Sequence, residues 1–316
     1  VSVFTPITWA ELEVFLQSFA LGRLHSFAGI AEGAENSNFF VSLDAGNFVL
    51  TLVERGARSH LPFTVALLER LQQAGLPVPF AVRDQQGEAV LQLAGKPALL
   101  QPRLVGKHIL KPDRQHCAEV GTALARMHLA TAGAVLEHPS DRGLAWMLEQ
   151  GSQQAIKLAE RQRALLKRAL RDVQALQLSW STLPQANLHA DLFRDNVLFD
   201  GPQLSGMIDF HNACSGPMLY DVAIAVNDWC CASDKQLDED LTHALLSAYG
   251  QLRPFSPAEA HQWEAFLRVG CLRFWLSRLL AVQTAHHSGV QIKPPEEFEQ
   301  RLIRRQTGQI SLPLAL

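Results

Sequence analysis

The segment from His189 to Asp209 reads H-A-D-L-F-R-D-N-V-L-F-D-G-P-Q-L-S-G-M-I-D and is the most informative part of the sequence about the fold. Its apolar runs, V-L-F and M-I, are separated by a turn sequence at Asp200-Gly201, which predicts a β-hairpin. Asp191 and Asn196 precede the first arm, and Asp209 follows the second. The segment therefore predicts two carboxylates and one amide held at one end of a buried hairpin.

These three residues fit phosphoryl transfer from ATP. That reaction needs a carboxylate to accept or orient the proton of the attacking hydroxyl, and oxygen ligands for the Mg²⁺ that bridges the phosphates. Magnesium prefers carboxylate and amide oxygens alongside phosphate and water, so Asn196 and Asp209 suit it. Taken singly, Asp and Asn in loops are most often turn or capping residues. Their combination with the hairpin favours an ATP-dependent kinase.

The motif H-x-D-x-x-x-x-N followed by I-D-F is similar to the catalytic loop and metal site of protein kinases. With H-A-D and D-F-H in place of H-R-D and D-F-G, it resembles the aminoglycoside phosphotransferase and choline kinase superfamily. This resemblance implies a bilobal, protein-kinase-like α+β fold. It implies that Asp191 is the catalytic base and that His189 supports the loop. Asn196 and Asp209 would bind Mg²⁺, with ATP as the co-substrate.

Four further blocks resemble one branch of that superfamily, the bacterial homoserine kinases. The blocks are Glu32–Val41, Phe48–Glu54, Tyr220–Cys231 and Leu272–Leu279, so the resemblance covers about residues 26 to 280. It implies an enzyme that phosphorylates the side-chain hydroxyl of L-homoserine, a step toward threonine.

Residues 1–102 are predicted to form a strand-rich N-lobe with a nucleotide-binding sheet. The capping box Thr8-x-x-Glu11 begins an opening helix, and Pro62 begins a second helix that should stop near Gly75. Asp44–Asn47 has the composition of a hairpin turn. Strands are expected over Leu24–Ile30, Asn38–Leu43, Phe48–Glu54, Glu88–Leu93 and Pro97–Gln101.

Residues 103–316 are predicted to form a larger, helical C-lobe, with the boundary near Pro102–Lys111. Asp113 caps a strong helix, further helices fill roughly 142–178, and helices return from about 219 to 285. The segment from Ala186 to Phe210 interrupts them with β-structure. Strands followed by helices are an α+β arrangement, and ligand sites favour the cleft between such lobes.

The nucleotide is expected to contact the N-lobe. The loop Gly33–Asn38 lies where this fold covers the ATP phosphates, although its composition also fits a plain polar turn. Most kinases place a lysine on the third strand to pair with the phosphates, whereas this chain has Thr51. Arg55 or Arg58 could replace it, although each fits a solvated surface charge better. The usual helix partner of that lysine, here Glu69, has no assigned role. The candidate ATP-binding residues are Asn36, Ser37, Asn38, Thr51 and Gln101.

The acceptor pocket of a homoserine kinase must bind an ammonium and a carboxylate. Asp228 and Asn227, on a predicted helix, are candidates for the ammonium. Arg273 or Arg278 is a candidate for the carboxylate because a guanidinium fork matches it, while the alternative is that these arginines pair with acidic residues of neighbouring helices. The resemblance implies that Asp221 braces the catalytic loop.

Three other functions compete with this interpretation. Tyr220, Trp229, Phe274 and Trp275 could cage a quaternary ammonium, so choline, an aminoglycoside or another small amino alcohol is an alternative acceptor. The spacings H-x-D and D-x-H also suit a metal-dependent phosphohydrolase, although His286-His287 has no carboxylates beside it. An inactive kinase-like scaffold would not need Asp191, Asn196 and Asp209 together.

Composition indicates an ordinary globular protein of 316 residues, 47% hydrophobic and 19% charged. A net charge of −3 gives no reason to expect a nucleic acid or an anionic membrane as a partner. The five cysteines form no C-x-x-C pair, and neither a signal peptide nor a membrane span is expected. We therefore expect a cytoplasmic enzyme; the sequence does not indicate its oligomeric state.

Overall fold

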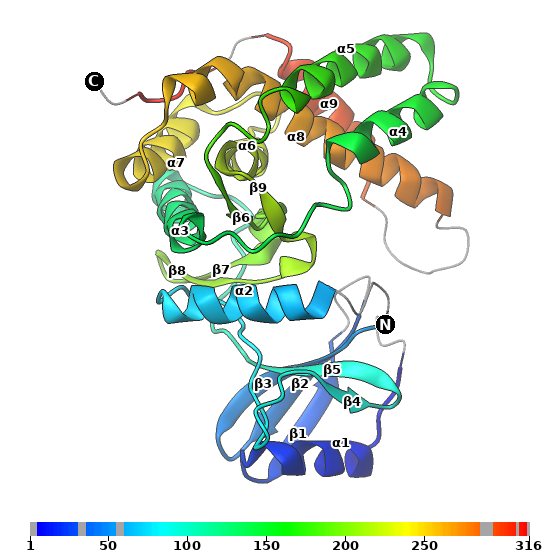
Figure 1. Cartoon of the computed structure of the whole chain (residues 1–316), viewed down its shortest axis with the longest axis vertical. Helices are drawn as coiled ribbons and strands as arrows, with labels where there is room; N and C mark the ends of the chain where they lie inside the picture. Colours follow the sequence, from blue (N-terminus) through cyan, green and yellow to red (C-terminus); the bar gives the residue numbers. More distant parts are fainter. Residues whose placement is uncertain (1–4, 31–35, 55–59, 285–292, 308–309, 315–316) are drawn as a thin grey trace. The chain divides into compact units, whose positions relative to one another are not determined.

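An antiparallel sheet organises the first of the two units into which the chain divides, Val1–Val105 and Gly106–Leu316 (Figure 1). The computed structural model describes residues 5–30, 36–54, 60–284, 293–307 and 310–314. The five strands are ordered β1-β2-β3-β5-β4. They are β1 (Leu24–Gly29), β2 (Ser37–Leu43), β3 (Gly46–Leu52), β4 (Leu91–Leu93) and β5 (Lys96–Pro102).

The two faces of this sheet differ. In β2, the buried residues Phe39 and Val41 alternate with the half-buried residues Asn38 and Phe40. The buried set joins Leu50 and residues of the first helix in one hydrophobic cluster, as expected for a sheet with one face covered. The predicted hairpin turn is confirmed, because β2 and β3 are joined through the two residues after Leu43.

Two helices accompany the sheet. Helix α1 (Trp9–Leu16) has the predicted capping box, in which the Thr8 N–H donates to Glu11 Oε2 at 2.7 Å, and a short 3₁₀ turn follows it. Helix α2 (Leu61–Gln73) begins with Pro62 in its first turn. Gly75, two residues past its end, has φ of +73°, the left-handed geometry that commonly follows a helix.

The second unit is mainly helical. Asp113 caps its first helix, as predicted. The helices are α3 (Arg114–Ala132), α4 (Leu144–Ala155), α5 (Glu160–Gln177), α6 (Met218–Trp229), α7 (Glu239–Leu252), α8 (Pro257–Thr284) and α9 (Glu296–Arg304). The strands are β6 (Gln185–Leu188), β7 (Val197–Asp200), β8 (Gln203–Met207) and β9 (Cys214–Pro217). The predicted hairpin is β7–β8, whereas β9 and α9 were not anticipated.

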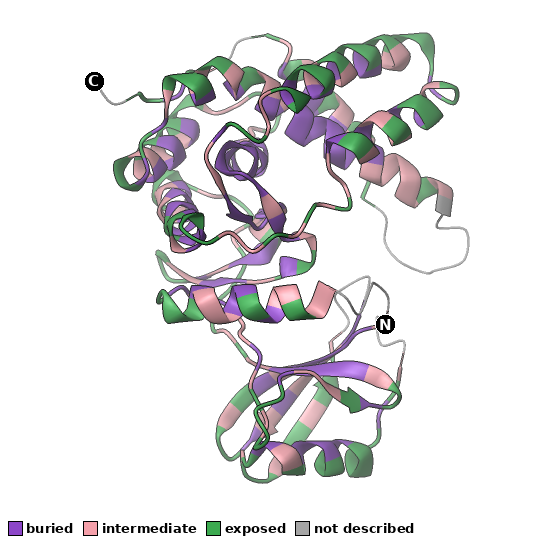
Figure 2. Ribbon diagram, in the orientation of Figure 1, coloured by how far each residue is buried: buried purple, intermediate pink, exposed green. Residues whose placement is uncertain are grey.

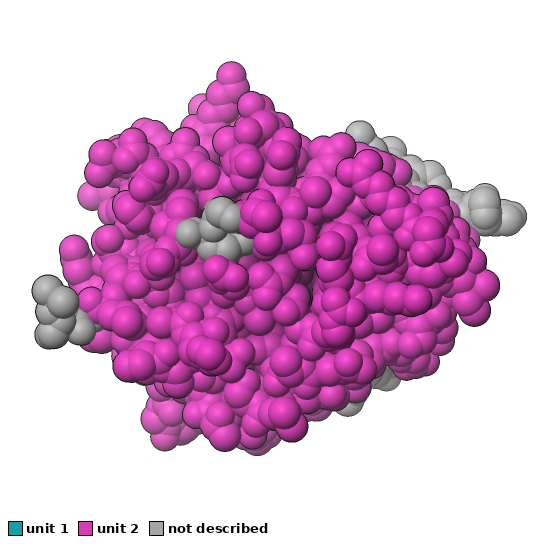
Figure 3. All heavy atoms as spheres, turned by 90° about the horizontal axis from the view of Figure 1, so that it is seen from above, with its two compact units in different colours: residues 1–105 teal, residues 106–316 magenta. Residues whose placement is uncertain are grey.

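Helix α6 lies at the centre of this unit. Every residue from Met218 to Trp229 is buried, which Figure 2 shows as a helix coloured purple along its length. Figure 3 shows one outer face of residues 106–316 with all heavy atoms. None of the described helices is both long enough and apolar enough to cross a membrane.

Candidate active site

The predicted catalytic loop, His189–Asn196, begins where β6 ends, and α6 fixes its path. The Asp221 carboxylate accepts hydrogen bonds from the backbone N–H groups of His189 at 2.7 Å and Ala190 at 2.8 Å. Ala190 has a left-handed backbone with φ of +58°, a conformation that costs energy in a residue with a Cβ. The two bonds from Asp221 therefore stabilise a turn that the chain would otherwise avoid.

His189 connects this loop to the strand that leads to Asp209. Its buried ring contacts the Ile208 carbonyl through Nε2 at 2.9 Å and accepts at Nδ1 from the Asp191 N–H at 3.3 Å. Burial lowers the pKa of His189, so a neutral ring with its proton on Nε2 satisfies both contacts. With both nitrogens engaged, His189 is not the metal ligand that a phosphohydrolase with the H-x-D spacing would need.

Asp191 is half-buried and has an unusual acidity. Its Oδ2 accepts from Asn212 Nδ2 at 3.0 Å, and its backbone carbonyl accepts from Asn196 Nδ2 at 2.8 Å. Burial raises the pKa of the Asp191 carboxyl to about 7, even though the charge of Arg273 acts in the opposite direction. A carboxylate that titrates near neutrality suits a general base.

The hairpin brings Asn196 and Asp209 to the same end. The Ile208 N–H donates to the Asn196 carbonyl at 2.9 Å, one residue before Asp209. Because Nδ2 of Asn196 donates to the Asp191 carbonyl, its Oδ1 is turned away and has no hydrogen-bond partner in the described part of the chain. That amide oxygen is therefore available to a cation.

Asp209 supplies a carboxylate beside this amide. Its backbone is left-handed, with φ of +62°, and its side chain is 45% exposed. Oδ1 accepts from the His211 N–H at 3.4 Å, which leaves Oδ2 for a ligand. An amide oxygen and a carboxylate oxygen on adjoining arms fit Mg²⁺, which completes its shell with phosphate and water. Among the described residues, His, Cys, Asp and Glu form no cluster of three that could hold a metal ion.

Asn212 is a site residue that the sequence reading did not single out. Its Oδ1 accepts from Arg273 Nη2 at 2.7 Å while its Nδ2 donates to Asp191. Arg273, expected to bind an acceptor carboxylate, is 1% exposed and also donates to the Ala190 carbonyl. The available signal was the position of Asn212 three residues after Asp209; its partner on α8 is remote in the sequence.

Asn227 does not lie open to a ligand. It is 1% exposed, its Nδ2 donates to the Leu267 carbonyl at 2.8 Å, and its Oδ1 accepts from Arg305 Nε at 2.8 Å. This placement does not favour the expected contact of Asn227 with an acceptor ammonium, because the side chain is packed and hydrogen-bonded inside the second unit.

Asp228 is paired within the protein as well. It accepts from Arg194 Nε at 3.1 Å and from Arg301 Nη1 at 3.3 Å. Burial by itself would raise the pKa of Asp228, but the charges of Arg194 and Arg301 hold it below its usual value. The carboxylate is thus ionised and paired with two arginines, which does not favour its expected role as an ammonium ligand.

Arg278 pairs with a neighbouring helix, the alternative that the sequence left open. Its Nη1 lies 2.6 Å from Glu297 Oε2, and its guanidinium lies 4.5 Å from the ring centroid of Phe298. Phe298 in turn stacks on Phe193 of the catalytic loop, with ring centroids 5.9 Å apart. Arg278 therefore reaches the neighbourhood of the loop without contacting Asp191.

The four aromatic residues considered for a quaternary-ammonium cage are buried core residues. Tyr220 contacts Trp180 at 5.2 Å between ring centroids, and Trp229 donates from Nε1 to the Leu192 carbonyl at 2.9 Å. Phe274 stacks on Phe298. These contacts give the aromatics packing roles and do not favour a choline-type acceptor. The four residues are Tyr220, Trp229, Phe274 and Trp275.

In the first unit, three candidate ATP-binding residues share one face of the sheet. Asn38 is directly opposite Thr51, whose Oγ1 donates to Asn38 Oδ1 at 2.8 Å. Gln101 is opposite Val49, two residues from Thr51, so the strand alternation places it on the same face. The Gln101 amide donates to the Pro79 carbonyl. This is the face of the sheet to which β2 contributes its half-buried residues Asn38 and Phe40.

Asn36 and Ser37 are placed differently. Ser37 is fully buried and donates to Glu54 Oε1 at 2.6 Å, and the Glu54 N–H donates to Asn36 Oδ1 at 3.2 Å. Both side chains therefore tie the start of β2 to the end of β3. The remainder of the predicted phosphate loop, residues 33–35, lies outside the described residues, as do Arg55, Arg58 and His286-His287.

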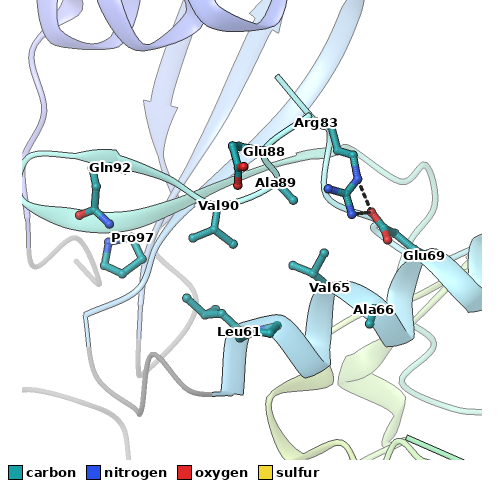
Figure 4. A pocket seen from close by; sticks show the side chains of 11 residues that line it. Leu61, Val65, Ala66, Glu69, Arg83, Glu88, Ala89, Val90, Gln92 and Pro97 are labelled. Carbon is teal, nitrogen blue, oxygen red and sulfur yellow. Dashed lines mark hydrogen bonds and ion pairs between the residues drawn. The ribbon is translucent and has the colours of Figure 1, made fainter. Parts of the chain in front are cut away.

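Glu69, the counterpart of the usual lysine partner, pairs with a different cation. Arg83 Nη2 lies 2.6 Å from Glu69 Oε1 at the edge of a pocket of about 440 Å³ between α2 and the β4–β5 region (Figure 4). Apolar side chains such as Val65 and Val90 point into this pocket. None of the candidate site residues lines it.

The first unit contains a sheet, and the second unit is mainly helical. The second unit also has a carboxylate, an amide and a second carboxylate at one end of the β7–β8 hairpin. Together these features define a kinase-like phosphotransferase. The chain belongs to the phosphotransferase enzyme family, which matches residues 26–255. A homoserine kinase of Pseudomonas aeruginosa (strain LESB58) is 58% identical over 315 residues, covering 100% of both chains. A homoserine kinase of Methylobacillus flagellatus is 41% identical over 280 residues, covering 88% of this chain and 86% of the relative.

Solved structures show the same fold at low identity. The amicoumacin kinase hAmiN, in complex with AMP-PNP and Ca²⁺, aligns with a TM-score of 0.70 at 18% identity, covering 94% of this chain and 92% of that chain. The choline kinase of Cryptosporidium parvum aligns with a TM-score of 0.63 at 13% identity, covering 95% and 94%. The predicted α+β, protein-kinase-like fold is thereby confirmed.

Proposed function

We propose that this chain transfers the γ-phosphate of ATP to the side-chain hydroxyl of L-homoserine, a step of threonine biosynthesis. The arrangement of Asp191, Asn196 and Asp209 at one end of β7–β8 carries the proposal, because it supplies a base and two magnesium ligands. The choice of acceptor is supported by relatives called homoserine kinases, one of which is 58% identical along the full chain.

In this proposal Asp191 is the general base. Its carboxylate accepts the proton of the homoserine hydroxyl as that oxygen bonds to the γ-phosphorus, and the bond from phosphorus to the ADP oxygen breaks. A pKa of about 7 leaves a substantial deprotonated fraction at neutral pH. His189 and Asp221 hold the loop in the path that presents this carboxylate.

Asn196 Oδ1 and Asp209 Oδ2 are the oxygens that would hold Mg²⁺. When bound, the metal neutralises charge on the phosphates and orients them. We propose Asn38 and Thr51, with Asn36, Ser37 and Gln101, as the part of the first unit that serves ATP; for Ser37 and Asn36 the contribution is to fix the strand ends.

Arg278 is our candidate for the acceptor carboxylate. Its side chain is 12% exposed and it stacks on Phe298, which contacts Phe193 of the catalytic loop. Arg278 also pairs with Glu297, but it is less deeply buried than the other three candidates. Asn227, Asp228 and Arg273 are 1%, 6% and 1% exposed and have partners inside the protein. Arg278→Gln should raise the KM for L-homoserine more than the KM for ATP.

The test is incubation of the purified protein with radiolabelled ATP, Mg²⁺ and a panel of acceptors: L-homoserine, choline, an aminoglycoside and 3-amino-1-propanol. Phosphorylation of L-homoserine with the highest kcat/KM supports the proposal. A higher kcat/KM for another acceptor would identify that acceptor as the substrate in place of L-homoserine. Release of phosphate without transfer would indicate hydrolysis instead.

A further inference from the structure

Arg273 reaches the catalytic loop from the middle of α8. Its Nη1 donates to the Ala190 carbonyl, and its Nη2 donates to Asn212 Oδ1 at 2.7 Å. Asn212 then donates from Nδ2 to Asp191 Oδ2 at 3.0 Å. A continuous chain of hydrogen bonds thus joins a buried guanidinium to the proposed base through one amide.

The surroundings of Arg273 set it apart from other arginines of the same helix. Arg268 forms a bidentate pair with Asp172 at 2.7 and 2.9 Å, and Arg278 pairs with a carboxylate of α9. Arg273, only 1% exposed, has no carboxylate within ion-pair distance among the described residues; one of its bonds goes to the Ala190 carbonyl and the other to the Asn212 amide oxygen. Burying a cation is costly, so such an arrangement needs compensation from the groups that it faces.

The amide of Asn212 is oriented by what lies on each side. A guanidinium can only donate, so it requires the amide oxygen, and a carboxylate can only accept, so it requires the NH₂ group. The orientation that satisfies Arg273 therefore also aims a donor at Asp191. Meanwhile the bond to the Ala190 carbonyl fixes the left-handed residue just before the base.

We propose that Arg273 is a positioning residue for phosphoryl transfer, holding Asp191 through the Asn212 amide and the Ala190 carbonyl, and that it does not bind the acceptor. The inference rests on the proposed role of Asp191 as the base. Loss of this bracing misplaces the carboxylate, and a displacement of about 1 Å in a catalytic group can cost on the order of 100-fold in rate.

A double-mutant cycle tests the inference. Arg273→Gln should lower kcat by about 10- to 100-fold with little change in the KM values for ATP and acceptor. In the Asp191→Asn background the same change should have almost no further effect, because the group that Arg273 positions is already gone. Rate losses that multiply independently in the double variant would overturn the proposal.

A second readout separates positioning from substrate binding. The acceptor 3-amino-1-propanol lacks the carboxylate of L-homoserine. If Arg273 positions Asp191, then Arg273→Gln should slow both acceptors by a similar factor and keep the preference between them. A selective loss with the carboxylate-bearing acceptor would show that Arg273 binds the substrate and would overturn the proposal.

Arg268→Gln is the matched control, since it removes a bidentate arginine contact from the same helix without touching the loop. It should leave the kcat near the wild-type value. If Arg273→Gln fails to fold, as a melting curve would show, Asn212→Ala replaces it in the cycle; unchanged kcat in that variant would overturn the inference.

The cycle is run with whichever panel acceptor turns over fastest, so that a wrong acceptor does not affect it. If the wild-type protein turns over none of the acceptors, the proposed function is wrong. If the wild-type protein turns over an acceptor but the rate losses of the two single variants multiply independently in the double variant, only the proposed role of Arg273 is wrong.

Discussion

Asp191 lies in surroundings that act on its carboxyl in opposite directions. Burial raises its pKa to about 7, whereas the nearby charge of Arg273 lowers it. The hydrogen bond from Asn212 fixes one oxygen, Oδ2, and leaves the other, Oδ1, for a hydroxyl proton. A base with a pKa near the working pH combines a useful deprotonated fraction with proton affinity.

Asp191→Asn should therefore lower kcat by on the order of 10²- to 10⁴-fold, because the amide fills the same space but cannot accept the proton. The Kd for ATP, measured by calorimetry, should stay close to the wild-type value. Near-normal kcat in a continuous ADP-release assay would rule out the base role.

Asp209→Ala should weaken the binding of Mg²⁺ with ATP, because it removes the proposed carboxylate ligand at the end of the hairpin. We expect the Mg²⁺ concentration for half-maximal rate to rise at least about tenfold, the scale seen when metal-site groups are removed. Asp200→Ala is a matched control: it removes an exposed carboxylate at the other end of the same hairpin. Equal Mg²⁺ titrations for both variants would contradict the assignment.

At the scale of elements, hydrogen bonds to helix α6 hold the predicted catalytic loop in place. Asp221 and Asp228 are seven residues apart, two helical turns, and therefore share one face. Asp221 accepts from the N–H groups at the start of the loop, and Asp228 accepts from the Arg194 N–H at 2.9 Å further along. At a loop position between these two contacts, the Leu192 carbonyl accepts a hydrogen bond from Trp229 Nε1. One buried helix thus holds the loop at several points.

This arrangement predicts a pH-dependent stability effect at Asp228. Asp228→Asn should lower the free energy of unfolding by about 3 kcal/mol at neutral pH, because it leaves the partly exposed Arg194 without a carboxylate and the buried Arg301 with Glu297 alone. The folded-state pKa of Asp228 lies below its unfolded value of 3.8. Its stabilisation is therefore fully present above that value and lost as the pH falls through the lower, folded-state pKa.

Urea unfolding of wild type and Asp228→Asn at neutral pH and at successively lower pH checks this sign. The difference between the two proteins should be constant at neutral and mildly acidic pH and should shrink only below the unfolded-state pKa. A difference that grows on acidification would mean that the carboxyl is protonated in the folded protein.

At the scale of the whole molecule, each unit has an interior of its own. The first unit contains a core around β2, β3 and α1, and the second contains the buried helix α6 with its surrounding helices. The candidate magnesium ligands lie at a hairpin end, where Asn196 is buried but the Asp209 side chain is 45% exposed. Metal should thus be needed for catalysis and not for folding.

Chelation with EDTA should accordingly abolish phosphate transfer while leaving the melting temperature of the protein without nucleotide within about a degree, a stability change of only a few tenths of a kcal/mol. Added Mg²⁺-ATP at 100 times its Kd should stabilise the folded protein by about 2.7 kcal/mol. Differential scanning fluorimetry measures both effects. A large drop in melting temperature on chelation would indicate a structural metal.

Much of the fold was predictable because the signals are local. The capping box of α1, the Asp113 cap of α3, the β2–β3 turn and the β7–β8 hairpin depend on residues a few positions apart. Strand β9 was missed for the opposite reason, because it is only four residues long and forms by pairing with β6. Helix α9 lies beyond the expected last helix; its acidic first turn and basic last turn are local signals of a helix that the prediction did not use.

Local sequence was enough to predict the candidate set, because Asp191 and Asn196 precede the β7–β8 hairpin and Asp209 follows it, which places them at the same end. Which buried polar residues contact that set depends on the three-dimensional packing. Asp221, Asn212 and Arg273 come from distant segments, and Asp228 and Asn227 turned out to be neutralised inside the protein. The physical reason is that a buried charge or amide must be paired, and long-range packing selects the partner.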